Sequence, residues 1–137
     1  MKGSVIFMKK IKIYKCNVCG NLIFMLEDSS IVPFCCMKQM RPLEPNTSDG
    51  ALEKHVPDVT REGRIATVRV GELDHPMDPS HYIQWIYLVT SKGIYSKNLH
   101  PGDEPKADFL VSDDEVLEGA YAYCNIHGLW VREYIIP

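Results

Sequence analysis

The sequence predicts an all-β protein in two parts, a small metal-bound β unit followed by an antiparallel β-sandwich. Downstream of about residue 50, short runs rich in β-branched and aromatic residues are separated by turn-forming residues, which is typical of antiparallel strands. In Ile65–Val70, small or apolar residues alternate with Thr67 and Arg69, and this period of two indicates a half-buried strand. Four cysteines gather within residues 16–36, and no segment of ten or more residues has a helical pattern.

Length and composition define the class of protein. The chain has 137 residues, of which 45% are hydrophobic and 24% charged, and this is the composition of an ordinary globular protein. The net charge of −3 excludes the basic surface of a nucleic-acid-binding protein. The longest apolar runs, such as Ile83–Thr90, are much shorter than the ~20 residues that a membrane helix needs. We therefore expect neither nucleic acid nor a membrane as a partner.

The amino terminus and the cysteines predict a cytoplasmic location. The residues before Lys9 contain too few apolar side chains for the core of a signal peptide, which needs about 7–15. Both Met1 and Met8 are candidate start residues. Because a reducing compartment keeps thiols reduced, five cysteines there favour metal ligation over a disulfide scaffold.

The four amino-terminal cysteines define the first predicted domain, residues 1–45. Cys16 and Cys19 have the Cys-x-x-Cys spacing in which a tight turn directs two sulfurs at one ion. The vicinal pair Cys35 and Cys36 can complete a four-sulfur site, for which iron and zinc are both suitable. The surrounding apolar stretches are too short to stabilise a core unaided, so the metal is expected to supply much of the folding free energy.

The second predicted domain covers residues 46–137. The boundary lies in Arg41–Ala51, a segment with two prolines, a glycine and several turn formers. Turns are indicated around Gly63, Gly93, Gly102 and Ser112. The strands expected from the runs between them are Ile65–Val70, His81–Thr90, Gly93–Lys97, Ala107–Val111, Gly119–Cys124 and Leu129–Ile136. A single helical turn is possible at Asp113–Gly119.

A second group of metal-ligand residues lies in this domain. Cys124 is the cysteine that the amino-terminal cluster leaves over, and His127 follows it three residues later. One thiolate and one imidazole cannot close a metal site alone. Three more histidines, His55, His75 and His81, stand in turns or at strand edges upstream. Together these five residues are the candidate ligands of a second metal.

Three segments carry a resemblance to a known family. They read Glu-Lys-His-Val-Pro at Glu53–Pro57, His-Pro-Met-x-x-x-His-Tyr-Ile-x-Trp-Ile at His75–Ile86, and Cys-Asn-x-His-Gly at Cys124–Gly128. With the cysteines of the first domain, they resemble desulfoferrodoxin, the two-iron form of superoxide reductase, from about Ile11 to Trp130. Two differences are the stiffened Asp78–Ser80 loop and the first nine residues, which have no counterpart.

The resemblance implies a fold and two iron centres. The first domain would be desulforedoxin-like and the second an immunoglobulin-like sandwich. Iron in the first would be bound by four thiolates, and catalytic iron in the second by four imidazoles and an axial thiolate. The family's ligands correspond here to Cys16, Cys19, Cys35 and Cys36 at the first centre, and to His55, His75, His81, His127 and Cys124 at the second.

The resemblance also implies an activity and partners. The chain would reduce superoxide to hydrogen peroxide with electrons from rubredoxin or a similar donor, as a homodimer. Glu53 would ligate the ferric iron after turnover, and Lys54 would be the cation near its open face. Two alternatives remain: an iron protein that only transfers electrons, and a superoxide dismutase, which would need no donor.

Other conspicuous residues have simpler interpretations. His100 is expected to be a solvated loop residue, and Trp85 and Trp130 to pack in the core beside the ligand segments. The acidic run Asp113–Glu115 is expected to be an exposed turn. A hydrogen bond from Asn125 near the Cys124 sulfur would tune that sulfur, but the sequence alone does not show one.

Overall fold

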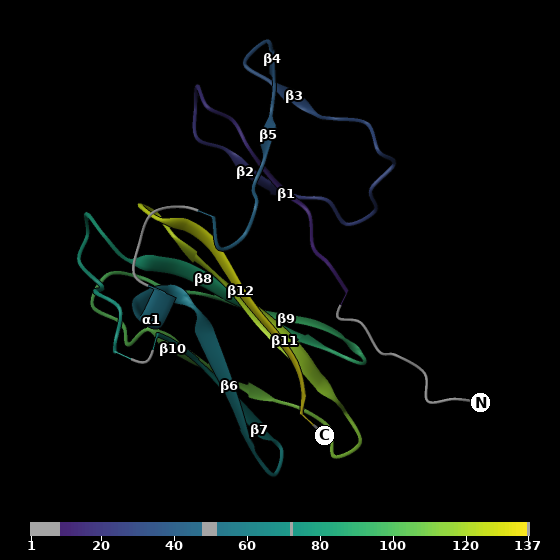
Figure 1. Cartoon of the computed structure of the whole chain (residues 1–137), viewed down its shortest axis with the longest axis vertical. Coiled ribbons are helices and arrows are strands. Elements are labelled where there is room, and N and C mark those ends of the chain that lie inside the picture. Colours follow the sequence, from purple (N-terminus) through teal and green to yellow (C-terminus); the bar gives the residue numbers. More distant parts are fainter. Residues whose placement is uncertain (1–8, 48–51, 72, 137) are drawn as a thin grey trace. The chain divides into compact units, whose positions relative to one another are not determined.

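We describe a computed structural model of the chain at residues 9–47, 52–71 and 73–136 (Figure 1). The side chains of Leu52, Glu53 and residues 134–136 lie outside this description. The described residues form two compact units, Lys9–Glu44 and a larger unit that starts at Pro45. No helix in the described ranges is long and apolar enough to cross a membrane.

The amino-terminal unit consists of very short strands around a small core. Its three-stranded sheet has the order β2-β1-β5, and β3 and β4 form a separate hairpin. The buried core consists of Tyr14, Cys16 and Met40, with partly buried neighbours such as Ile23. The strands are β1 (Ile13–Lys15), β2 (Leu22–Phe24), β3 (Phe34–Cys35), β4 (Lys38–Gln39) and β5 (Arg41–Pro42).

The second unit is an antiparallel sandwich of two sheets. One sheet has the order β10-β7-β6 and the other the order β12-β11-β8-β9, and all strand pairs are antiparallel. Before the first strand lies the short helix α1 (Leu52–His55). The strands are β6 (Pro57–Glu62), β7 (Ile65–Val70), β8 (Ile83–Thr90), β9 (Gly93–Asn98), β10 (Lys106–Leu110), β11 (Leu117–Cys124) and β12 (Gly128–Ile136).

The core of the sandwich lies between the two sheets. Ala66, Val68 and Val70 are the inward-facing residues of β7, as their alternation in the sequence predicted. They join one buried cluster with residues of the opposite sheet, including Ile86 and Ala122. Every described side chain of β11 is buried, which fits its place in the middle of the four-stranded sheet.

The strand directions bring three chain segments to one end of the sandwich. These segments are α1 with the start of β6, the connection between β7 and β8, and the turn that joins β11 to β12. In the last pairs of the ladder, Cys124 stands opposite Gly128 on one side and Ile83 on the other. All five candidate ligands of the second group lie in these segments.

The predicted all-β class is confirmed, and so are the six predicted strands to within a few residues. Three local features differ from expectation. The strand β6 was not predicted, since Pro57 begins it and four of its six residues are polar or charged. The helix α1 was also missed because it has a single turn. The proposed helical turn at Asp113–Gly119 is wrong, because β11 already begins at Leu117.

Candidate metal centres

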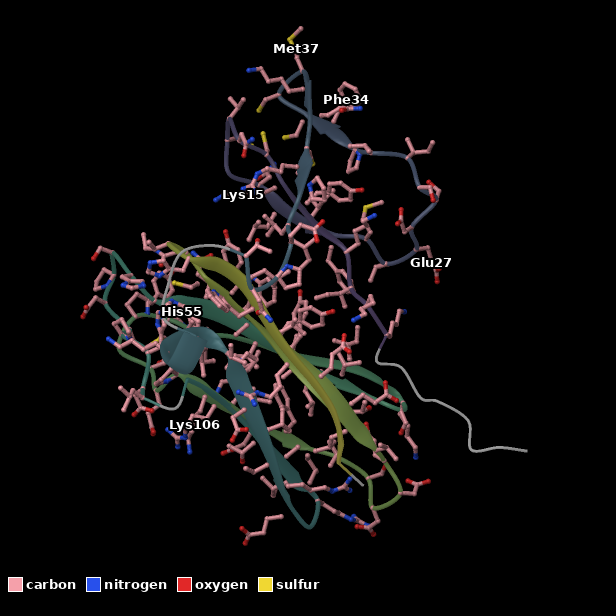
Figure 2. The ribbon with its side chains drawn as sticks, viewed as in Figure 1. Lys15, Glu27, Phe34, Met37, His55 and Lys106 are labelled. Carbon is pink, nitrogen blue, oxygen red and sulfur yellow. The ribbon has the colours of Figure 1, made fainter. Side chains whose placement is uncertain are left out.

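The five predicted ligands of the sandwich lie together at one of its ends. Their ligand atoms all lie within 4.8 Å of one another, although the residues are spread from position 55 to position 127. His55 ends α1, and its place beside that helix is visible in Figure 2. The others come from the β7–β8 connection, the end of β11 and the β11–β12 turn, and the group is His55, His75, His81, Cys124 and His127.

The ring atoms that face one another identify the donor nitrogens. Nε2 of His55 lies 2.9 Å from Nδ1 of His127. Two nitrogens that bind one ion at about 2.1 Å and at a right angle would be about 3.0 Å apart. Nδ1 of His127 also lies 3.8 Å from Sγ of Cys124. His127 therefore presents Nδ1 to the site, whereas His55 presents Nε2.

The other two histidines have buried nitrogens that lack a partner. Among the described residues, Nε2 of His75 and Nε2 of His81 are buried without any hydrogen bond. Nδ1–H of His75 donates to the carbonyl of Pro76 at 2.7 Å, which leaves Nε2 as the lone-pair nitrogen. Histidine ligands commonly donate their second nitrogen in this way. Because buried polar atoms are normally paired, the two unpaired nitrogens fit a metal site.

Burial favours the metal-binding form of two histidines in this group but disfavours that of the sulfur. Burial lowers the pKa of His75 to about 4, and the neighbouring imidazoles act in the same direction. The pKa of His81 is lowered by burial and by the charges of His127 and Lys54. Both rings are thus neutral near pH 7. Burial raises the pKa of the Cys124 thiol, so its thiolate needs a nearby cation.

Glu53 and Lys54 directly precede the first ligand in the chain. The Lys54 side chain is exposed, and its charge acts on His81, so it lies within electrostatic reach of the site. The Glu53 side chain is outside the described residues. Its predicted role therefore stays a prediction.

Three residues that were not predicted as part of the site connect its segments. The indole of Trp130 stacks on the ring of His55, and its Nε1–H donates to the carbonyl of His127. Gly71 has φ +84°, and a Cβ there would lie 2.6 Å from the carbonyl oxygen of Lys54. The Asn125 side chain bonds to the backbone beside His81 and not to the sulfur. Trp130 stands beside the last motif and Asn125 within it, so both had a signal in the sequence, whereas Gly71 had none.

The four amino-terminal cysteines form the other group of candidate metal ligands. Their sulfurs all lie within 4.8 Å of one another, with 3.6 Å between Cys19 and Cys35 and 3.9 Å between Cys35 and Cys36. Four sulfurs placed tetrahedrally at 2.3 Å from one ion would be about 3.8 Å apart. The spacing of the sulfurs therefore fits a four-thiolate metal site.

A hairpin turn explains how two adjacent cysteines reach one ion. Cys36 and Met37 connect β3 to β4 and have φ of +53° and +65°. Positive φ at both central residues is the signature of a type I′ turn. For residues other than glycine this conformation costs about 1–2 kcal/mol each. A ligand that holds Cys36 in place would offset that cost.

The thiols of this group differ widely in pKa. Hydrogen bonds from the backbone N–H groups of Cys19 and Val18 to Sγ lower the pKa of Cys16 to about 6. Interactions with the thiols of Cys19 and Cys16 raise the pKa of Cys36 to about 12. A metal cation would stabilise the thiolate form of all four sulfurs together.

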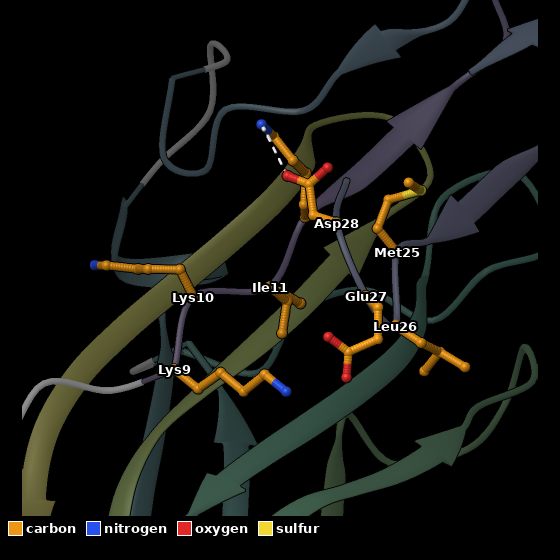
Figure 3. Close-up of a pocket in the computed structure, with 8 residues that line it drawn as sticks. Lys9, Lys10, Ile11, Met25, Leu26, Glu27 and Asp28 are labelled. Carbon is orange, nitrogen blue, oxygen red and sulfur yellow. Dashed lines mark ion pairs between the residues drawn. The ribbon is translucent and has the colours of Figure 1, made fainter. Parts of the chain in front are cut away.

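The remaining predictions have mixed outcomes. His100 is a loop residue with a side chain 81% exposed, as expected. Glu115 does not belong to an exposed turn with Asp113 and Asp114, because it is only 1% exposed. Figure 3 shows a pocket on the amino-terminal unit that contains neither cysteine nor histidine. Its lining is Lys9, Lys10, Ile11, Lys12, Met25, Leu26, Glu27 and Asp28, with an ion pair between Lys12 and Asp28.

Comparison with known proteins gives consistent matches. A family model described as Desulfoferrodoxin matches residues 47–133. A desulfoferrodoxin homolog from Archaeoglobus fulgidus is 46% identical over 119 residues, which cover 87% of this chain and 94% of the relative. A superoxide reductase from Thermococcus kodakarensis is 36% identical over 100 residues, which cover 59% of this chain and 85% of the relative. The crystal structure of the superoxide reductase from Treponema pallidum matches with a TM-score of 0.77 at 33% identity, covering 91% of this chain and 100% of that one.

Proposed function

The chain belongs to the desulfoferrodoxin family, and from this premise we propose that it is a superoxide reductase. The reaction adds one electron and two protons to superoxide and yields hydrogen peroxide. One observation carries the proposal: four imidazoles and one thiol converge at the end of the sandwich, and two of the imidazole nitrogens are buried without a partner. Iron bound by these residues supplies the electron.

The donor set suits a metal that also binds a small substrate. His55, His75, His81, His127 and Cys124 are the proposed ligands. Because these residues offer five ligand atoms, an ion that takes six ligands would keep one position for superoxide. The neutral imidazoles and the single thiolate bring one negative charge, so the site stays positive overall with a divalent ion.

Electrostatics at this site favour an anionic substrate although the whole chain has a net charge of −3. The Lys54 ammonium adds a positive charge next to His55 and acts on His81. Local fields of this kind raise the association rate of a charged substrate by about 10–10³-fold, and salt weakens them. We assign Lys54 to steering superoxide and to holding a water that supplies a proton to the reduced oxygen. Glu53 is the proposed ligand of the ferric iron after turnover.

We assign the second iron to Cys16, Cys19, Cys35 and Cys36, in a domain of residues 1–45 that precedes the catalytic domain of residues 46–137. Four thiolates leave no coordination position for a substrate, so this site transfers electrons or stabilises the fold. A rubredoxin or similar protein is the proposed electron donor. A cytoplasmic homodimer is the proposed assembly, and both of these proposals rest on the family resemblance.

The stoichiometry of the reaction tests the proposed function. The iron-loaded chain is supplied with superoxide and reduced rubredoxin without oxygen, and donor oxidation, peroxide and oxygen are measured together. We expect one donor molecule oxidised for each peroxide formed and no oxygen released from superoxide. Oxygen release without donor consumption would indicate a dismutase. Zinc at both sites of the purified chain, measured by metal analysis, would contradict the proposal.

A further inference from the structure

The side chain of Asn125 connects two ligand segments of the proposed catalytic site. Asn125 follows Cys124 directly and precedes His127 by two residues. Its Oδ1 accepts a hydrogen bond from the N–H of Tyr82 at 2.9 Å, and its Nδ2 donates to the carbonyl of Ser80 at 3.1 Å. The N–H of Asn125 donates to the carbonyl of Tyr82 at 3.2 Å. These three bonds bracket His81, because Ser80 and Tyr82 are its neighbours in the chain.

The segment of His81 is a closed turn. The N–H of Asp78 donates to the carbonyl of His81, and the N–H of His81 donates to the carbonyl of Asp78, at 3.0 and 2.9 Å. The turn is thus tied to itself. Its nearest strand pairing is between β8 and β11, and that ladder has a register irregularity between Tyr123 and Cys124 before it ends at the Cys124–Ile83 pair. Beyond the last pair of the ladder, the hydrogen bonds of Asn125 connect the two segments.

We propose that Asn125 is a positioning residue that fixes His81 relative to Cys124 and so holds these two ligands at the distance that one metal ion requires. Asn125 does not contact the Cys124 sulfur in the described hydrogen bonds, so it acts on the site through the backbone on both sides of His81. This inference rests on the proposed function only in that the five residues bind a metal. Partners of this kind typically change metal affinity by about 10–100-fold when they are removed.

Two substitutions separate the hydrogen bonds from the packing of the side chain. Asn125→Ala removes both side-chain bonds. Asn125→Asp keeps the size and the acceptor for Tyr82, but it places a second acceptor against the Ser80 carbonyl. Asn46 offers a matched control, because its Oδ1 accepts from the N–H of Val131 at 2.9 Å and its Nδ2 donates to the carbonyl of Val131 at 3.0 Å. Asn46→Ala therefore loses two bonds of the same kinds away from the ligand segments. Because Asn46 has φ +63°, alanine is also strained at this position.

The experiment follows iron release from the full chain into excess EDTA. Native mass spectrometry counts the metal ions per chain, and the absorption of the four-thiolate centre identifies the site that loses its ion. The energy of the Cys124 sulfur-to-iron absorption band is recorded on the loaded proteins. We expect both Asn125 variants to release the iron of the five-ligand site about 10–100-fold faster and to shift this band. Asn46→Ala should behave as the wild type in both measurements.

Three results would contradict the inference. Iron release from Asn125→Ala at the wild-type rate would overturn it, with Asn125→Asp deciding if the alanine variant does not fold. Equally fast release from Asn46→Ala would also overturn it, because the effect would then follow global stability. A wild-type chain that holds no metal at the five residues would instead overturn the proposed function, and the inference with it.

Discussion

The indole of Trp130 lies nearly parallel to the imidazole of His55, with ring centroids 4.8 Å apart and 22° between the ring planes. The same indole donates its Nε1–H to the carbonyl of His127 at 3.1 Å. Trp130 therefore contacts one ligand through its ring face and the turn of another through its edge. With 1% of its surface exposed, Trp130 is also almost fully buried.

A pair of variants should distinguish the contributions of the two Trp130 contacts to the free energy of unfolding. Trp130→Phe keeps a ring against His55 but loses the hydrogen bond to His127, which should cost about 0.5–1.5 kcal/mol of unfolding free energy. Trp130→Ala also opens a cavity and should cost about 3–5 kcal/mol. Chemical denaturation of the metal-loaded chain measures both values.

Trp85 provides the control for these variants. It stacks between Tyr87 and Tyr123, with centroid distances of 4.4 and 5.5 Å, and is only partly buried. Trp85→Ala should therefore be less destabilising than Trp130→Ala and should leave metal retention at the five-ligand site unchanged. Equal metal loss in the two alanine variants would refute a specific role for Trp130.

Gly71 and Gly63 form a second matched pair. Both have positive φ, +84° and +62°, so alanine is strained at either position. At Gly71 the added Cβ would lie 2.6 Å from the carbonyl oxygens of Lys54 and Leu73, whereas at Gly63 it would meet nothing within 4 Å. Gly63→Ala should cost about 1–2 kcal/mol. Gly71→Ala should cost more and also lower the metal content of the sandwich, because it separates the segments of His55 and His75.

Denaturation midpoints and metal analysis of both glycine variants test this expectation. A Gly71→Ala chain as stable and as metal-rich as Gly63→Ala would show that the close approach to Lys54 does not matter. Replacement of Gly63 itself leaves the ligand segments untouched, so its metal content should equal that of the wild type.

The ligands and the residues that hold them differ in how far the sequence could predict them. Cys124, His127 and their partners are chemically distinctive and stand in motifs that resemble those of a known family, and this resemblance was sufficient to predict them. Asn125 and Gly71 act through the backbone of segments distant in the sequence, and such contacts exist only once the sheets have paired. An amide or a glycine looks the same in the sequence whether or not it makes such a contact.

Glu115 illustrates the same limit for the fold. As part of an acidic run it has the pattern of an exposed turn, and Asp113 does behave so, with a side chain 73% exposed. Glu115 is instead buried against the hydroxyl groups of Thr90 and Tyr95, which lie on neighbouring strands. Residue type decides burial only on average, and a carboxylate is buried where the tertiary structure supplies donors.

Lys54→Met should slow the reaction with superoxide and weaken its dependence on salt. Loss of the ammonium removes an attractive charge beside the site, and we expect about a 10-fold slower encounter at low ionic strength. Pulse radiolysis at several salt concentrations gives the rate and its slope. Lys92→Met makes the same change of charge beyond the far end of β8, where Lys92 pairs with Asp114 at 2.9 Å. Equal salt slopes in wild type and Lys54→Met would exclude steering by Lys54.

Glu115 should give the sandwich a pH-dependent share of its stability. Burial alone would raise the pKa of Glu115, but hydrogen bonds from Thr90, Ser112 and Tyr95 outweigh it and hold the pKa below its ordinary value. A carboxyl whose pKa is lower in the folded state stabilises the fold above its unfolded pKa of about 4.3. This contribution is lost as the pH falls through the lower, folded value.

Glu115→Gln should therefore be less stable than the wild type by about 1.5–3 kcal/mol at pH 7. The difference should shrink below about pH 4, as the wild-type carboxylate becomes protonated. Urea denaturation at a series of pH values measures it. Asp113→Asn is the control, because the exposed pair of Asp113 with Arg64 is worth at most about 1 kcal/mol. A difference independent of pH would contradict the role of the Glu115 charge.

Removal of the metal should unfold the amino-terminal unit and leave the sandwich folded. The unit Lys9–Glu44 is shorter than the about 40 residues below which a domain usually needs a metal or disulfide. Phe34 and Met37 are 67% and 97% exposed, and Figure 2 shows Met37 directed away from the ribbon, so neither adds to its small core. After chelation, amide hydrogen exchange should become fast throughout Lys9–Glu44 but stay slow in the buried strand β11. Slow exchange in β1 of the metal-free chain would show that this unit is stable through its own packing.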